Sequence, residues 1–136
     1  MDKMSEFCIK TSSAVPLYEQ IKREIKLWIL SEKLLPNDRL IPIREFAKQL
    51  NVNQNTIVKV YYQLYMEGFV YSKPGQGYFV NQRDKKDSSK SEKLFLELTE
   101  EYIQTATDLG FKTECIVKCI KSFSNDRKKS NLKRLE

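Results

Sequence analysis

The 136-residue chain contains 24 Lys and Arg residues against 18 Asp and Glu residues, a formal net charge of +6, and no histidine. The absence of histidine excludes imidazole-based catalytic triads and general bases, and it excludes histidine-ligated metal sites. The longest unbroken aliphatic or aromatic run is the four residues Leu27–Leu30, and the N-terminus lacks the apolar stretch of a signal peptide. We therefore expect neither a membrane span nor secretion.

Three cysteines, Cys8, Cys115 and Cys119, form an odd set without a secretion signal, which predicts reduced thiols and a cytoplasmic protein. Cys115 and Cys119 share one face of a helix, but a metal site would need two more ligands. We interpret them as small apolar residues packed in a helix interface, and we predict no metal and no cofactor. No catalytic constellation is found either, so the sequence does not predict an enzyme.

Two helices are predicted in the first part of the chain. Pro16 is suited to the first position of a helix, whose core-facing stripe comprises Leu17, Ile21, Ile25 and Trp28. After a turn at Pro36–Asp38, a second, short helix is expected over Ile43–Leu50.

A third helix follows a tight turn. Asn51 tolerates the left-handed conformation of that turn, and Asn53 is a favourable N-cap for a helix that runs to about Glu67 and stops at Gly68. The order of helices and turn resembles the core of a helix-turn-helix domain.

A β-hairpin is predicted next, because two runs rich in β-forming residues flank a glycine-rich tip. The runs are Phe69–Tyr71 and Tyr78–Val80, and the tip is Ser72–Gly77. Helix, helix, tight turn, helix and hairpin is the order of a winged helix-turn-helix. The expected fold is mainly α with a small β-hairpin wing.

A two-helix module is predicted after a polar linker. The domain boundaries are a winged helix over 8–81, a linker over 82–90, a helical pair over 91–126 and a basic, frayed or solvated tail over 127–136. Two helices cannot enclose a core alone, so their apolar faces need cover from the first module or from a second copy of the chain. We favour a second copy and therefore expect a homodimer. The expected dimerisation residues are Leu94, Leu98, Ile103, Ala106, Leu109, Ile116, Val117, Ile120 and Phe123.

The third helix has a polar side suited to DNA. At 100° per residue, Asn55 and Lys59 lie within about 20° of the pole opposite Ile57, with Tyr62 about 40° away from that pole. Asn bonds adenine, Lys reaches guanine acceptors or a phosphate, and Tyr bonds a phosphate.

Further DNA contacts are expected from the wing and the first two helices. Gly75 and Gly77 bracket Gln76, a slim tip that suits the minor groove, with Lys73 just before it. The glycines also serve the positive φ angles of the turn. Tyr18 lies near a helix N-terminus that favours phosphate, or it is an aromatic cap of the core; Arg44 opens the second helix.

These motifs resemble the winged-helix domain of the GntR family of bacterial transcription regulators. The resemblance is carried by Pro16–Ile21, Pro36–Leu40, Ile43–Ala47, Leu50–Ile57, Glu67–Val70 and Gly75–Val80. The string Asn53–Thr56 with Lys59–Tyr61, followed by a short helical pair, is similar to the YtrA-like branch, whose members dimerise through those helices. The resemblance implies a DNA-contacting set of Arg44, Asn55, Thr56, Lys59 and Gly77; with the other candidates, the predicted set adds Tyr18, Asn53, Gln54, Tyr62, Lys73, Gly75 and Gln76.

The sequence departs from the family pattern at several positions. Asn37 replaces the usual Gly, Ile41-Pro42 replaces Pro-Ser, and Gln76 replaces an Arg of the wing tip. Without the Ser, we do not expect the usual cap of the second helix or a phosphate bond from it, and without the Arg we expect the electrostatic part of wing binding to be weaker. No DNA contact is assigned to Val58, where other branches carry an Arg.

The predicted function is a homodimeric, sequence-specific DNA-binding regulator. We expect a repressor that binds an inverted repeat in double-stranded DNA, with the third helix in the major groove and the wing in the minor groove. The alternative is a winged-helix protein-interaction module, which need not place Asn55 and Lys59 opposite its core stripe. A small-molecule effector is compatible with the sequence, but no residue specifies one.

Overall fold

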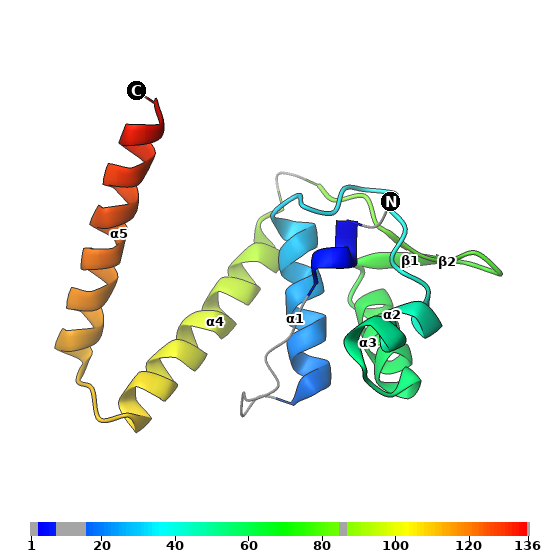
Figure 1. Cartoon of the computed structure of the whole chain (residues 1–136), viewed down its shortest axis with the longest axis horizontal. Helices are drawn as coiled ribbons and strands as arrows, with labels where there is room; N and C mark the ends of the chain where they lie inside the picture. Colours follow the sequence, from blue (N-terminus) through cyan, green and yellow to red (C-terminus); the bar gives the residue numbers. More distant parts are fainter. Residues whose placement is uncertain (1–2, 8–15, 85–86, 136) are drawn as a thin grey trace. The chain divides into compact units, whose positions relative to one another are not determined.

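The computed structural model describes residues 3–7, 16–84 and 87–135, with side chains described as far as Lys128. Cys8, the lower limit of the predicted domain, and two lysines of the predicted linker lie outside these residues. The chain divides into two compact units, the first ending at Ser91 and the second beginning at Glu92. Figure 1 labels the helices and strands of both.

Three helices form the body of the first unit: α1 (Leu17–Leu30), α2 (Ile43–Leu50) and α3 (Gln54–Met66). Pro16 precedes α1 as its N-cap, one position earlier than expected, because its carbonyl accepts the first helical bond from the Gln20 amide at 3.2 Å. Both α1 and α2 pack against α3, so α3 is the centre of the helical layer.

The turn between α2 and α3 has the predicted geometry. Asn51 adopts the left-handed conformation with φ 54°, and the Val52 amide donates to the Ala47 carbonyl at 2.9 Å. The Asn53 side chain then accepts from the Asn55 amide at 2.8 Å, which satisfies one of the free donors at the start of α3. Local side-chain chemistry therefore fixes the direction of α3.

The wing is an antiparallel hairpin of β1 (Val70–Lys73) and β2 (Gly77–Val80). Its strands extend further toward the tip than predicted, because Ser72 pairs with Tyr78 and Lys73 with Gly77; only 74–76 form the turn. Phe69 lies before β1, although the prediction placed it in the strand. The ladder overrides the weak β-propensity of Ser72 and Lys73.

The core of the first unit joins the helices to the hairpin and to the N-terminus. Its largest fully buried side chains include Phe46, Ile57, Leu64 and Tyr61, whose hydroxyl donates to the Ile41 carbonyl at 2.6 Å. N-terminal residues also belong to this core: Met4 is buried, and the Phe7 ring centre lies 5.3 Å from Trp28 and 5.2 Å from Phe46. Both precede the predicted domain start at residue 8, so the core reaches further toward the N-terminus than the sequence indicated.

Part of the predicted linker is fastened to this unit. Arg83 donates to the Leu30 carbonyl at 2.9 Å, and Lys90 donates to the Gly68 carbonyl at 3.1 Å. The Lys90 ammonium also lies 4.6 Å from the Phe69 ring centre. Residues 89–90 are helical, since α4 (Ser89–Asp108) begins inside the predicted linker.

The second unit consists of the rest of α4 and α5 (Thr113–Leu135). Gly110, with φ 94°, ends α4, and the Phe111 amide closes the cap by donating to the Ala106 carbonyl at 3.0 Å. The predicted tail at 127–136 is not a separate frayed segment, because α5 continues to Leu135. Neither Gly nor Pro interrupts the sequence from Phe111 onward, and Lys and Arg are good helix formers.

Candidate nucleic-acid interface

The exposed side of α3 carries most of the predicted DNA-contacting groups. Its buried stripe comprises Ile57, Val60, Tyr61 and Leu64. The side chains of Gln54, Asn55, Lys59 and Tyr62 are exposed, and Thr56 is half-buried at the flank. Asn53 is exposed as well, but its side-chain oxygen is engaged in capping the helix. The polar side of α3 therefore faces away from the core of the first unit.

Lys59 and Tyr18, predicted separately, lie together. The Lys59 ammonium is 3.8 Å from the centre of the Tyr18 ring, a cation–π contact that joins α3 to the first turn of α1. Tyr18 is half-buried and packs against the edge of the core, and the predicted phosphate contact of its hydroxyl stays a prediction. A hydrogen bond to the Glu19 carboxylate, reinforced by its negative charge, raises the pKa of Tyr18.

Arg44 is exposed in the first turn of α2. The N-cap of this helix is Pro42, which makes no side-chain capping bond. The replacement of the family's Ser by this proline therefore removes a capping hydroxyl. The Arg44 guanidinium remains available as the cationic group at this end of α2.

The wing tip is narrow and polar. Gly75 and Gly77 have φ angles of 73° and 109°, and Gln76 between them is exposed. The Lys73 ammonium lies 4.8 Å from the centre of the Phe79 ring, so this cation is held along the hairpin. A Cβ on Gly75 would meet nothing within 4 Å; the positive φ alone requires glycine there.

Arg39 is a cation of the wing that sequence reasoning did not select. Its Nε would lie 3.6 Å from a Cβ added to Gly77, and its backbone forms a bridge with Phe79. The segment before α2 therefore runs beside β2, where Leu40 donates to the Tyr78 carbonyl at 2.9 Å. The signals in the sequence were the predicted turn at Pro36–Asp38 and the stretch Pro36–Leu40, which belongs to the family resemblance. An exposed guanidinium beside Gly77 adds positive charge where Gln76 replaces the family's Arg.

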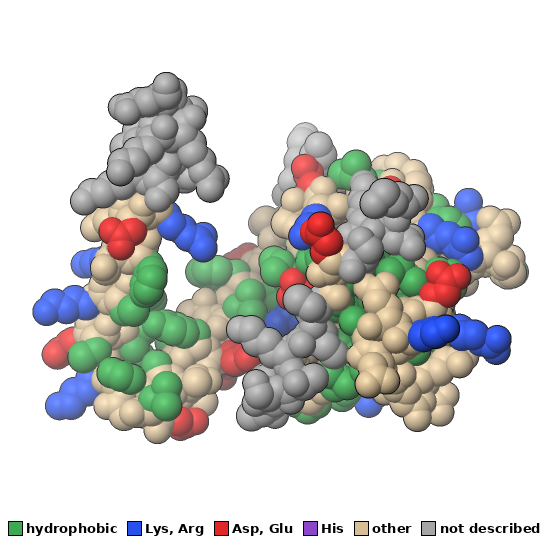
Figure 2. Space-filling model, in the orientation of Figure 1, with side chains coloured by type: hydrophobic (Ala, Val, Ile, Leu, Met, Phe, Trp, Pro, Cys, Tyr) green, Lys and Arg blue, Asp and Glu red, His purple; other side chains and the backbone are tan. Residues whose placement is uncertain are grey.

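The predicted dimerisation residues divide into two groups. Leu94, Ala106 and Ile116 are already buried within the chain. The other six keep between 38% and 71% of their side-chain surface exposed: Leu98, Ile103, Leu109, Val117, Ile120 and Phe123. Figure 2 shows such hydrophobic side chains on the visible surface of α5. These six side chains leave an apolar surface exposed on the second unit.

The prediction placed Ile103 on the wrong side of its helix. It was grouped with Leu94, from which it lies about 180° around α4 at 100° per residue. In the structure it lines a separate shallow groove with Leu96, Thr99 and Thr107. The exposed apolar surface of α4 therefore has two sides.

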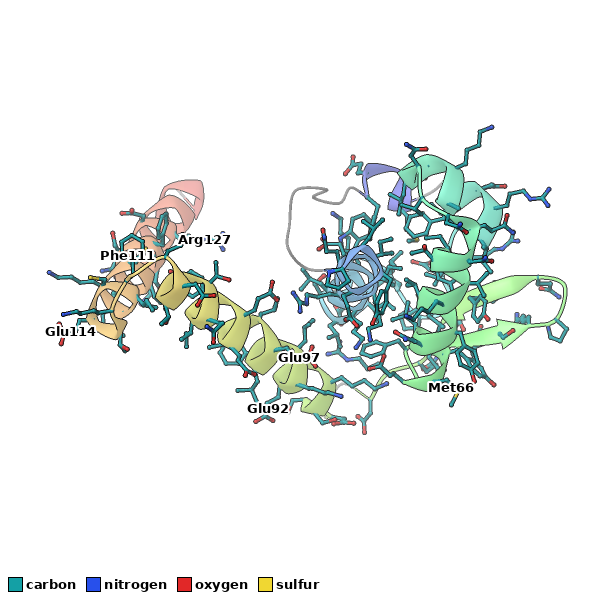
Figure 3. All side chains as sticks on the ribbon, turned by 90° about the horizontal axis from the view of Figure 1, so that it is seen from below. Met66, Glu92, Glu97, Phe111, Glu114 and Arg127 are labelled. Atoms are coloured by element: carbon teal, nitrogen blue, oxygen red, sulfur yellow. The ribbon has the colours of Figure 1, made fainter. Side chains whose placement is uncertain are left out.

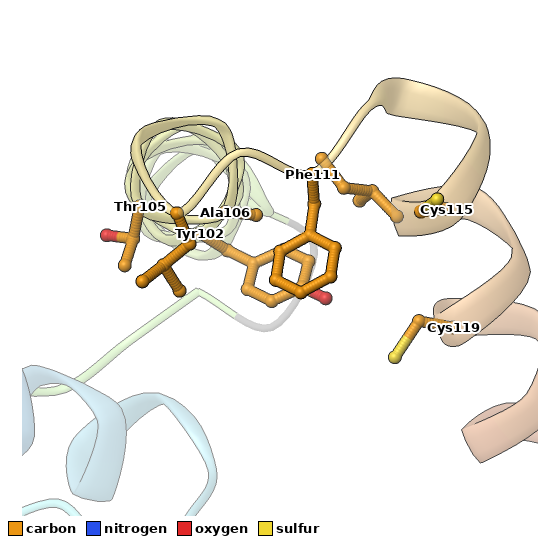
Figure 4. Close-up of a pocket in the computed structure, with 8 residues that line it drawn as sticks. Tyr102, Thr105, Ala106, Phe111, Cys115 and Cys119 are labelled. Atoms are coloured by element: carbon orange, nitrogen blue, oxygen red, sulfur yellow. The ribbon is translucent and has the colours of Figure 1, made fainter.

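A hollow of about 310 Å³ lies where α4 meets α5, and it is lined by Tyr102, Phe111, Cys115 and Cys119 among others. Figure 4 shows Tyr102 on α4 and Phe111, which follows Gly110, among the side chains that line it. The two cysteines were expected to be packed in an interface, but both are exposed, because α5 presents them to this open hollow. Among the described residues, no group of three or more acidic, Cys or His side chains is placed to hold a metal ion.

A helix-turn-helix with exposed amide, ammonium and phenol groups on its third helix, followed by a β-hairpin, defines a winged-helix DNA-binding protein.

No helix in the described part of the chain is long and apolar enough to cross a bilayer.

Comparisons with known proteins agree with this class and narrow it. Residues 17–80 match the model of the family "Bacterial regulatory proteins, gntR family". The chain is 33% identical over 112 residues to the uncharacterized HTH-type transcriptional regulator YhcF of Bacillus subtilis, covering 82% of this chain and 93% of that protein. It is 30% identical over 121 residues to the transcriptional repressor YtrA of the same organism, covering 88% and 93%.

A solved structure extends the similarity to both units. A GntR family transcriptional regulator from Listeria monocytogenes superposes with a TM-score of 0.65 at 27% identity, covering 84% of this chain and 98% of that one. This chain belongs to the GntR family of DNA-binding transcription regulators and is not an enzyme. The predicted resemblance to the YtrA-like branch is confirmed.

Proposed function

We propose that the protein is a homodimeric repressor that binds an inverted-repeat operator, α3 entering the major groove and the wing entering the minor groove. The observation that carries this proposal is the exposed polar side of α3, where Asn55 and Lys59 lie opposite the buried stripe. A protein-docking winged helix would not need this arrangement. Amide and ammonium groups suit base edges and phosphates.

Repression is supported by the relative YtrA of Bacillus subtilis, which is named a transcriptional repressor and matches most of both chains.

Dimerisation is supported by the exposed apolar side chains of the second unit. Leu109, Ile120 and Phe123 each have more than half of their surface exposed. Burial of such groups against a second copy would supply the hydrophobic free energy that the two helices lack by themselves. A two-fold dimer reads an inverted repeat, because each winged helix then meets an equivalent half-site.

Contacts to the sugar-phosphate backbone are assigned to cations around α3. Arg44 at the start of α2, Lys59 on α3 and Arg39 beside the wing are exposed, and all three lie in the first unit. Phosphate contacts fix the register of the protein on the duplex, and the α3 side chains then read the bases.

Selection of bound sequences from a random duplex library tests this proposal. The expected result is a palindromic consensus for the wild-type protein and no enrichment for the double variant Asn55→Ala with Lys59→Ala. Lys118→Ala, which removes an exposed lysine of α5, is the control and should recover the wild-type consensus. Absence of any enrichment by the wild-type protein would contradict the DNA-binding proposal and favour a protein partner.

A further inference from the structure

We propose that Val58 selects a thymine in each half-site by packing its methyl groups against the C5-methyl group of that base. This inference rests on the proposed function, since it requires α3 to lie in the major groove. It assigns a specificity-determining role to a position for which the sequence suggested no DNA contact.

Val58 is an exposed aliphatic side chain on the polar side of α3. It lies in the N-terminal half of α3 and keeps 45% of its surface exposed, although Ile57 beside it is fully buried. The N-terminal half of a recognition helix is the part that reaches base edges in helix-turn-helix proteins. Asn55 and Tyr62 are its neighbours at three and four residues, so all three side chains share one exposed surface.

The two flanks of α3 carry different chemistry. Val58 and Lys59 lie on opposite sides of Asn55, about 60° and 40° away at 100° per residue. Lys59 is on the side of α1, where its ammonium rests on the Tyr18 ring. Val58 is on the side of Tyr65, whose ring contacts Tyr78 of the wing at 6.5 Å between centres. Lys59 is thus held toward α1, which leaves Val58 to meet the base next to Asn55 on the wing side.

The chemistry of the major groove determines what this valine favours. The C5-methyl of thymine is the apolar group among the base edges there, whereas guanine, adenine and cytosine present acceptors and donors. A valine against such polar edges would remove water from them without replacing its hydrogen bonds. α3, which the structure describes in full, carries no arginine, the side chain that most often reads guanine.

The test removes the methyl group from the DNA rather than from the protein. Each thymine of the selected half-site is replaced in turn by deoxyuridine, and affinities are measured by fluorescence anisotropy for the full-length protein. At one thymine, the wild-type protein should bind about fourfold more weakly per half-site, the worth of one buried methyl group. Val58→Ala should bind the thymine and uracil duplexes equally at that position.

Met66→Ala provides the matched control. Met66 is another exposed apolar residue of α3, 64% exposed and eight residues further along, at the C-terminal end of the helix (Figure 3). This variant should keep the wild-type preference for thymine, and circular dichroism should show all three proteins equally helical. Equal binding of every thymine and uracil pair by the wild-type protein, or a thymine preference retained by Val58→Ala, would overturn the inference. Failure of the wild-type protein to bind any selected duplex would instead overturn the proposed function.

Discussion

Lys59 is restrained before any DNA is bound. A free lysine side chain loses rotamer freedom when it binds a phosphate, and this loss weakens the contact. The Tyr18 ring, 3.8 Å from the ammonium, removes part of that freedom in the unbound protein. The N–H donors of the Lys59 ammonium that point away from the ring stay free to bind a phosphate. Lys59 can therefore contribute both to the packing of α1 against α3 and to the candidate DNA interface.

Lys59→Ala should weaken operator binding and reduce its dependence on salt. If Lys59 neutralises one phosphate, the slope of log K against log salt concentration should become shallower by about 0.9. Fluorescence anisotropy across a salt series measures both quantities. Lys118→Ala is the matched lysine control, and an unchanged slope in Lys59→Ala would remove Lys59 from the phosphate contacts.

Tyr18 should act partly through Lys59. Tyr18→Leu removes the ring and should weaken binding by about two- to fivefold, the worth of an exposed cation–π contact, but should have a smaller effect in the Lys59→Ala background. Tyr18→Phe keeps the ring and removes only the hydroxyl. Weaker operator binding by Tyr18→Phe than by the wild-type protein would therefore indicate a direct contact of the hydroxyl with a phosphate. Equal effects of Tyr18→Leu in both backgrounds would show that the ring does not position Lys59.

Tyr61 links the core to the segment before α2 through a single hydrogen bond. Its hydroxyl is buried and donates to the Ile41 carbonyl at 2.6 Å, and burial raises the pKa of this phenol far above its ordinary value. Tyr61→Phe should lower the free energy of unfolding by about 1–3 kcal/mol, because the Ile41 carbonyl loses its partner. Urea denaturation measures this change; Tyr62→Phe, at an exposed position, should change stability by less than about 0.5 kcal/mol.

At the scale of elements, boundaries set by local chemistry were predictable and boundaries set by pairing were not. The range Ile43–Leu50 was predicted correctly because Pro42 and Asn51 fix its ends within the chain segment itself. Strands β1 and β2 were predicted too short, because Ser72 and Lys73 join the ladder through partners across the hairpin. Such partners are invisible to single-residue propensities.

The same distinction applies to the candidate interface. The exposure of Asn55 and Lys59 followed from helical periodicity alone. The contact of Lys59 with Tyr18, and the approach of Arg39 to Gly77, join segments far apart in sequence and depend on how they pack. The positions of the Lys59 ammonium and the Arg39 guanidinium therefore come from the structure, because helical periodicity does not predict contacts between distant segments.

The start of α4 should respond to pH through Asp87. Its carboxylate accepts a hydrogen bond from the Ser89 amide at 2.9 Å. Hydrogen bonds from the side chain and the backbone of Ser89 lower the pKa of Asp87. A lowered pKa in the folded state means that the carboxylate stabilises this turn above the ordinary pKa, and that the stabilisation is lost as pH falls through the lowered value. An NMR titration of Asp87 should therefore give a midpoint below 3.8.

Asp87→Asn tests the same turn at neutral pH. It removes the charge while keeping a side-chain oxygen, so the Ser89 amide should exchange with solvent faster than in the wild-type protein. An Asp87 midpoint at or above its ordinary value would contradict the capping role.

At the scale of the whole molecule, charge and apolar surface are distributed unequally. Residues 1–80 carry 11 basic and 8 acidic side chains, whereas residues 92–121 carry 4 basic and 6 acidic ones. The positive excess therefore lies on the winged helix, where phosphates are expected, and on the polar linker and the basic C-terminal segment, but not on residues 92–121. The exposed apolar side chains of α4 and α5 accompany the acidic part, where subunit pairing is expected.

The wild-type protein should sediment at twice its chain mass of 16.1 kDa at micromolar concentration. Placing a charge in the exposed apolar surface, as in the double variant Ile120→Glu with Phe123→Glu, should shift the protein to monomer and weaken operator binding. Leu35→Glu is the control, since Leu35 is an exposed apolar residue of the first unit and its replacement should leave the dimer intact. A monomeric wild-type protein in analytical ultracentrifugation would refute the dimer.

The hydrogen bonds around Gly68 indicate at which residue a DNA-binding fragment for fusion to another protein should end. The Gly68 carbonyl accepts from Asn81 at 3.3 Å and from Lys90 at 3.1 Å, and Arg83 donates to the Leu30 carbonyl. A fragment cut after Val80, where the hairpin stops, would leave both carbonyls without these donors and would remove Lys90 from the Phe69 ring, over which Lys26 would remain. A chimaera that joins this winged helix to a foreign dimerisation element should therefore be fused after Ser91, so that the first turn of α4 travels with the domain it supports.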